Sequence, residues 1–138
     1  MDKPTWTIHC ITDIAEYIAE YEKDCEYIGN FHTHGLNKYN NQRELCIVLA
    51  LEKSVAVNLL NTMGLRVANG ETVFTEGIRS DILQDDLDVQ LITFDNDPDL
   101  YVILPDPNGK LPMDDDCQEP YKSQIKYAEN ISKHKDYL

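Results

Sequence analysis

The chain has 138 residues and is 42% hydrophobic, which suits one compact domain that buries a sizeable core. It carries 25 Asp and Glu residues against 12 Lys and Arg, for a net charge of −13, and this balance argues against direct binding of nucleic-acid phosphates. No run approaches the ~20 apolar residues of a membrane span, and the amino-terminal residues lack the apolar core of a signal peptide, so we expect a cytoplasmic protein.

The amino-terminal residues predict two strands separated by a helix. Residues 5–11 alternate between polar and apolar side chains, as a short edge strand does. Residues 13–24 repeat apolar side chains at helical spacing, and Asp13 with Glu16 forms a capping box. Residues 25–35 predict the second strand, which a polar loop follows.

The middle of the chain predicts a central strand and a second helix. Residues 45–51 form a continuous apolar run, which is typical of a strand buried on both faces. Residues 53–70 carry apolar side chains along one helical face and end at Asn69-Gly70, a helix stop signal. Residues 71–77 predict a short extended piece.

The carboxyl-terminal residues predict a hairpin and a final helix. The hairpin joins 87–95 to 100–106, a turn follows at 106–110, and the helix covers about residues 120–133. The pattern as a whole predicts a single α+β domain over residues 1–138, with a mainly antiparallel sheet and two to three packed helices.

The segment from His32 to Gly35 is the strongest candidate for chemistry, because it holds two of the four histidines. Residues i and i+2 of a strand face the same side, about 7 Å apart, so the two imidazoles could share one ligand. A structural interpretation also fits: Thr33 and the histidines would hydrogen-bond a bend that Gly35 permits. The candidate pocket residues are His32, Thr33, His34, Gly35, Asn37 and Asp106.

A metal site at His32 and His34 would need further ligands, because zinc is held by three or four protein groups. His9, Cys46 or Asp106 could supply a third ligand only if the fold brings one of them near. We therefore expect no bound metal. There is no phosphate-binding glycine motif, so we expect no nucleotide cofactor either. The four cysteines are scattered, which indicates reduced thiols with mostly structural roles.

Acidic residues are concentrated between Asp81 and Glu119, where twelve acids accompany one base, Lys110. A solvated surface that keeps the protein soluble explains this pattern, and so does a face that binds a basic partner. The candidate residues of such a face are Asp85, Asp86, Asp114, Asp115 and Asp116.

Three motifs together resemble the bacterial domain family of unknown function called DUF4262. They are His32-Thr33-His34-Gly35-Leu36, Leu60-Asn61, and Pro105-Asp106 with Gly109 and Pro112. The resemblance covers about residues 6–125 and implies no activity, because none is established for the family. Many of its members resemble Tyr-Thr-Val-Gly-Leu at the first motif, which implies that two histidines are not a general requirement of the fold.

Three functional classes follow from these patterns. The leading hypothesis is a small acidic interaction module, of the kind found in bacterial or phage conflict systems, that neutralises a partner protein with a basic surface. The first alternative is a metal-dependent hydrolase centred on His32 and His34. The second is a pocket beside the same histidines that sequesters a small ligand.

Overall fold

A computed structural model of the chain describes residues 6–11 and 29–133. Their strands form one six-stranded sheet in the order β1-β2-β3-β6-β5-β4. The helix expected over residues 13–24 lies outside the described residues. Within them, no helix is long and apolar enough to cross a membrane.

The sheet is mixed, with one parallel pair among antiparallel ones. β1 (Thr7–Ile11), β2 (Gly29–His34) and β3 (Leu45–Leu49) pair antiparallel, as do β4 (Gly77–Arg79), β5 (Val89–Ile92) and β6 (Leu100–Ile103). The two halves join through β3 and β6, which run parallel. The α+β class and the predicted hairpin of β5 and β6 are thus confirmed.

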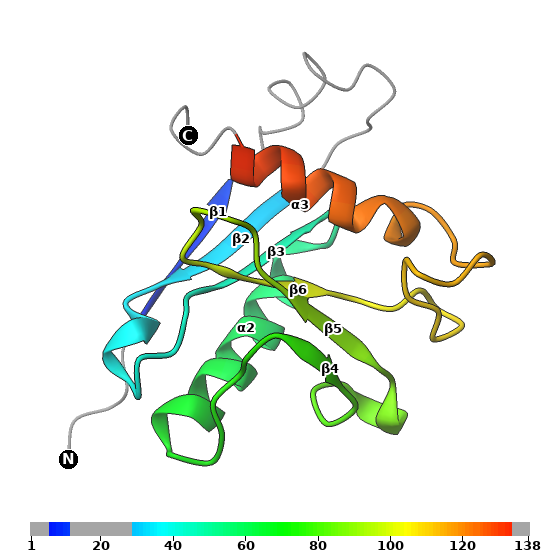
Figure 1. Cartoon of the computed structure of the whole chain (residues 1–138). Helices are drawn as coiled ribbons and strands as arrows, with labels where there is room; N and C mark the ends of the chain where they lie inside the picture. Colours follow the sequence, from blue (N-terminus) through cyan, green and yellow to red (C-terminus); the bar gives the residue numbers. More distant parts are fainter. Residues whose placement is uncertain (1–5, 12–28, 134–138) are drawn as a thin grey trace.

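The two described helices cover opposite faces of the sheet, as Figure 1 shows. α2 (Lys53–Ala68) packs over the larger core and α3 (Gln124–Lys133) over the smaller one. Strand β3 contributes to both cores: Leu45, Ile47 and Leu49 to the first, Cys46 and Val48 to the second. This two-sided burial is the physical reason for the unbroken apolar run of β3.

Trp6 anchors the start of β1 to helix α2. Its indole Nε1 donates a hydrogen bond of 3.0 Å to Oδ1 of Asn61. A Cβ atom at Gly64 would lie 2.6 Å from the Trp6 ring, so this position of the helix needs a glycine. The Leu60-Asn61 motif therefore has a structural role, because Leu60 is fully buried and Asn61 holds the indole.

Two buried glutamines hold irregular segments against the sheet. The Oε1 atom of Gln42 accepts from the Phe74 N–H over 2.7 Å, and its Nε2 donates to the Phe74 carbonyl over 2.9 Å. Gln124 binds both backbone groups of Leu104 in the same way. Because a side chain pairs Phe74, the extended piece expected at 71–77 forms no strand before Gly77, and β4 begins there.

Candidate functional site

The carboxylate of Glu44 organises the turn that follows β2. Its Oε1 accepts from the Thr33 hydroxyl over 2.9 Å and from the Leu36 N–H over 3.0 Å. Its Oε2 accepts from the N–H groups of Gly35 and Asn37 over 3.1 and 3.2 Å. Gly35 has φ 98°, a left-handed conformation that glycine adopts without steric cost. A bend at Gly35 was expected, but its acceptor is Glu44, which sequence reasoning did not identify.

Thr33 and the two histidines face opposite sides of β2. Thr33 is 1% exposed, and its Oγ1 also accepts from the Leu45 N–H over 2.9 Å. His32 and His34 lie on the other side by strand alternation, which is the side that α3 covers. His32 is half-buried and His34 is exposed. The structure therefore divides the predicted motif into a buried turn and a separate pair of imidazoles.

The register of the strands places His32 in a row of polar residues. Its Cα partners are His9 on β1 and Cys46 on β3, and Cys46 in turn lies beside Tyr101 on β6. The Cys46 thiol is buried and donates to Oδ1 of Asn30 over 3.2 Å. Cys46 forms no disulfide with a described cysteine, and its burial and hydrogen bond assign it a structural role.

Asp106 is separated from the histidines. β6 begins beside Leu45, near the turn after His34, and runs toward Asp106, so this residue lies beyond the opposite end of the sheet. Its Oδ1 accepts from the N–H groups of Asn108 and Lys110, over 2.8 and 2.9 Å. Its Oδ2 accepts from the Gln118 N–H over 2.9 Å. Burial alone would raise the pKa of Asp106, but these backbone donors outweigh it and hold the pKa below the ordinary value.

The two groups of candidate acidic residues lie at the same end of the sheet as Asp106. Residues 85–86 precede β5, and residues 114–116 follow β6. Leu87 lies close to Gly109: a Cβ atom added to Gly109 would be 3.1 Å from the Leu87 side chain. Four of the five acids, Asp85, Asp86, Asp115 and Asp116, are exposed. Asp114 is half-buried because its Oδ2 accepts from the Leu111 N–H over 3.0 Å. We call these four exposed acids and their loops the acidic end.

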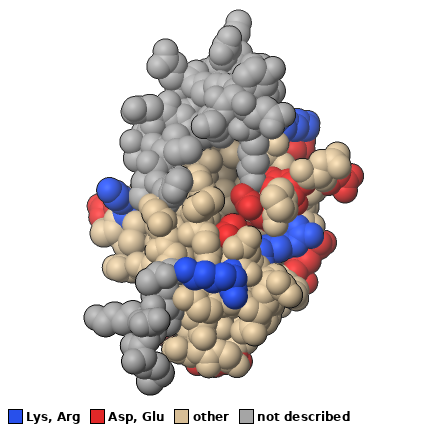
Figure 2. Space-filling view, turned by 90° about the vertical axis from the view of Figure 1, so that its left-hand side faces the viewer, with Lys and Arg blue, Asp and Glu red and all other residues tan. Residues whose placement is uncertain are grey.

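Charged side chains are scarce on the face of the molecule that Figure 2 shows. Viewed from the left-hand side of Figure 1, most of the described surface is uncharged, and acidic side chains gather near its right-hand margin (Figure 2). Acidic side chains are therefore distributed unevenly over this face.

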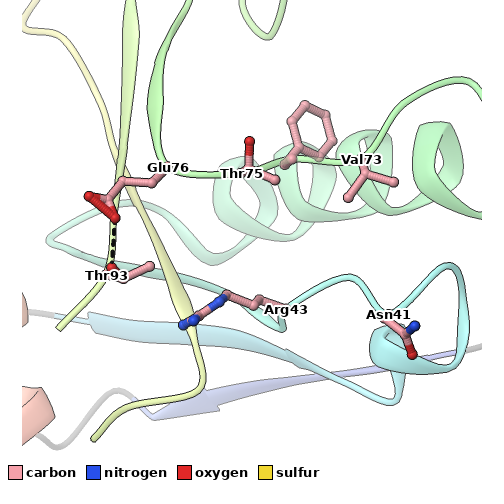
Figure 3. Close-up of a pocket in the computed structure, with 7 residues that line it drawn as sticks. Asn41, Arg43, Val73, Thr75, Glu76 and Thr93 are labelled. Carbon is pink, nitrogen blue, oxygen red and sulfur yellow. Dashed lines mark hydrogen bonds between the residues drawn. The ribbon is translucent and has the colours of Figure 1, made fainter. Parts of the chain in front are cut away.

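Two adjoining pockets flank Arg43, in the loop before β3. One measures about 240 Å³ and lies between Asn41, Arg43 and residues 73–76, with Thr93 hydrogen-bonded to Glu76 at one end (Figure 3). The other measures about 350 Å³ and includes Asn37, Arg43 and Glu44. Of the predicted pocket residues, Asn37 alone lines either of these two pockets.

Arg43 differs from the other two arginines in its partners. Its Nη1 donates to the Asp97 carbonyl over 3.2 Å, and it forms no ion pair with a described residue. Arg66 and Arg79 both pair with Asp81 and hold its pKa well below the ordinary value, Arg79 contributing most. The Arg43 pockets could hold a small polar ligand.

A buried polar group that the sequence did not reveal lies under α3. The Tyr101 hydroxyl donates to Oδ2 of Asp97 over 2.5 Å, and Ser132 donates to the same oxygen over 2.7 Å. Burial, together with Cys46 and Asp97, raises the pKa of Tyr101 far above its usual range. This group joins the β5–β6 turn to α3, and we assign it a structural role.

Comparison of the chain with protein-family models, with characterised proteins and with solved structures finds no match. Among the side chains that the structure describes, no three His, Cys, Asp or Glu residues are grouped so as to hold a metal ion.

Proposed function

We propose that the protein is an interaction module whose acidic end binds a partner protein through a cluster of Lys and Arg side chains. The observation that carries this proposal is that two acidic segments, about 30 residues apart in sequence, lie at the same end of the sheet. Complementary charge of this kind accelerates and orients association.

The loop that presents Asp115 and Asp116 is internally bonded, which favours binding over simple solvation. Asp106 holds three backbone N–H groups of the loop. The Cys117 thiol donates to the Lys110 carbonyl over 3.3 Å, and Nζ of Lys122 donates to the Asp114 carbonyl over 2.9 Å. A surface that is already ordered loses less conformational entropy when it binds.

Partner capture at two ionic strengths tests the proposal. The test variant replaces the four exposed acids of the acidic end by Asn. Asn tolerates the positive φ of Asp85 and Asp86. We expect the wild-type protein to retain basic proteins from a host lysate at low salt, with retention falling as salt screens the charges, and the variant to lose them. The substitutions are Asp85→Asn, Asp86→Asn, Asp115→Asn and Asp116→Asn.

A control variant with the same net charge separates a specific surface from total charge. Its four neutralised acids are exposed and lie elsewhere on the described surface: Glu52→Gln, Glu76→Gln, Asp95→Asn and Glu129→Gln. The control should retain the same proteins as the wild type. Equal loss in both variants would show that net charge alone attracts the partners and would remove the acidic end from the functional account.

We also propose that the chain is a divergent relative of the DUF4262 family. In support, each motif of the resemblance contains a residue that organises the fold: Thr33 in the Glu44 turn, Asn61 on Trp6, and Asp106 in the acidic loop. A solved structure of a family member tests this relation. It should place equivalent residues in these three contacts, and a different strand order would contradict the relation.

A further inference from the structure

We infer that the pocket between Arg43 and Glu76 binds a small zwitterion of the α-amino acid class. Arg43, in the loop before β3, and Glu76, just before β4, line the same pocket of about 240 Å³ (Figure 3). The two side chains carry opposite charges but form no ion pair with each other. A ligand with one negative and one positive charge would pair with both of them. The pocket is distinct from the acidic end, none of whose four acids lines it.

The guanidinium of Arg43 is held in place but is only partly occupied. Its Nη1 donates to the Asp97 carbonyl over 3.2 Å, and it makes no other hydrogen bond to a described residue. Asp97 is itself fixed, because its carboxylate accepts from the hydroxyls of Tyr101 and Ser132 over 2.5 and 2.7 Å. The Nε–Nη2 edge of the guanidinium is therefore available to a carboxylate, which accepts two parallel N–H bonds from arginine.

The carboxylate of Glu76 supplies the opposite charge at the Thr93 end of the pocket. Its Oε2 accepts from the Thr93 hydroxyl over 2.8 Å, the bond drawn as a dashed line in Figure 3. Within the part of the chain that the structure describes, Glu76 has no Lys or Arg partner and its Oε1 accepts no hydrogen bond. An ammonium group has three N–H donors and would bind this oxygen through a charge-assisted hydrogen bond.

The two walls of the pocket are joined by the Gln42–Phe74 pair. Gln42 directly precedes Arg43 on one wall, and Phe74 lies two residues before Glu76 on the other. The Gln42 amide makes two hydrogen bonds, of 2.7 and 2.9 Å, to the backbone of Phe74. These bonds fix the spacing of the walls before any ligand arrives, and a preformed pocket loses little conformational entropy on binding.

The size and the charges of the pocket select the class of ligand. A volume of about 240 Å³ lies below the ~300–1,000 Å³ of pockets for drug-sized molecules, which favours a ligand smaller than a nucleotide. Among the described residues of the lining, Arg43 is the one base and Glu76 the one acid. The Glu76 carboxylate would repel a doubly charged phosphate group. A carboxylate and an ammonium on one small molecule match the two charges one for one.

Nuclear magnetic resonance titration with L-alanine tests the site. The ¹⁵N-labelled protein is titrated at neutral pH and constant ionic strength to about 20 mM ligand, because a ligand with so few atoms binds weakly. We expect saturable shifts of the backbone amides of residues 41–43 and 73–76. Acetate and methylamine each carry one of the two charges, and each should bind at least about tenfold more weakly. Absence of saturable shifts with L-alanine, or equally strong binding of acetate or methylamine, would overturn the assignment.

Two variants remove the charges of the pocket one at a time. Arg43→Gln and Glu76→Gln should each weaken L-alanine binding at least about tenfold, and Gln at position 76 keeps an acceptor for Thr93. Lys53→Gln and Glu52→Gln are the matched controls, since both residues are exposed at the start of α2 and lie outside the pocket, and they should bind as the wild type does. Unchanged affinity in either pocket variant, or an equal loss in its control, would contradict the site. The comparison of L-alanine with acetate and methylamine on the wild type decides the question even if a variant misfolds.

Discussion

The hydroxyl of Thr33 donates to the carboxylate of Glu44, eleven residues later in the chain, and the same hydroxyl accepts from the Leu45 N–H. Thr33 thus joins β2 to β3 at the end where the chain turns. The most conspicuous motif of the sequence is a carboxylate-bound turn on one face of β2, and its histidines lie on the other face.

The first prediction concerns the Glu44 carboxylate. Glu44→Ala leaves the Thr33 hydroxyl and the N–H groups of Gly35 and Leu36 without their acceptor, which should cost about 2–4 kcal/mol in the free energy of unfolding. Urea denaturation measures this loss. Glu52→Ala, at an exposed glutamate whose side chain caps nothing, serves as control and should change stability by less than about 0.5 kcal/mol. Equal stability of the two variants would contradict the role of Glu44.

The second prediction concerns the buried amide of Gln42. Gln42→Leu keeps a side chain of similar size but leaves both backbone groups of the buried Phe74 unpaired, so unfolding should become easier by about 2–3 kcal/mol. Amide hydrogen exchange should accelerate first at residues 72–76, because Gln42 holds this segment in place of a strand partner. Unchanged exchange there would show that other contacts hold the segment.

The third prediction is a pH dependence that arises from Asp106. Its folded pKa lies below the ordinary value of 3.8, so its carboxylate stabilises the fold fully above that pH, and this stabilisation is lost as the pH falls through the folded pKa. Asp106→Asn should lower the urea midpoint at pH 7 and should lose less further stability than the wild type between about pH 4 and pH 2. Parallel curves for the two proteins would contradict this assignment.

Local patterns in the sequence predicted most of the fold. β1, β3, α2, the β5–β6 hairpin and the final helix follow from alternation, apolar runs and helical spacing, which each segment carries by itself. The contacts of Glu44, Gln42 and Gln124 did not follow, because a polar side chain that binds distant backbone groups leaves no periodic signal. The pairing of His9 with His32 was equally hidden, because strand register depends on tertiary packing.

The fourth prediction concerns the Tyr101 hydroxyl. Tyr101→Phe removes one of the two hydroxyl donors to the buried carboxylate of Asp97, which should destabilise the protein by about 1–3 kcal/mol.

The same hydroxyl should give the stability a pH dependence. The folded pKa of Tyr101 is raised, so the stabilisation by its hydroxyl is complete below the unfolded pKa of about 10 and is lost as the pH rises through the folded pKa. Unfolding experiments between pH 8 and pH 11 should show a weaker alkaline loss in Tyr101→Phe. An equal loss would assign the alkaline sensitivity to other groups.

The last prediction separates the stability of the acidic end from its binding. In the described structure, the carboxylates of the four exposed acids of the acidic end accept no hydrogen bond. Their one ion pair there is weak and exposed, between Asp116 and Lys110 at 3.6 Å. Neutralising all four should therefore leave the fold intact and raise the free energy of unfolding by a few tenths to about 1 kcal/mol at low salt, because like charges repel. The gain should shrink at about 0.5 M salt, where screening acts over only a few ångströms. Urea unfolding at both salt concentrations measures it. A loss of stability would show that these carboxylates hold their loops together and would make the partner-capture variant unsuitable as a test of binding.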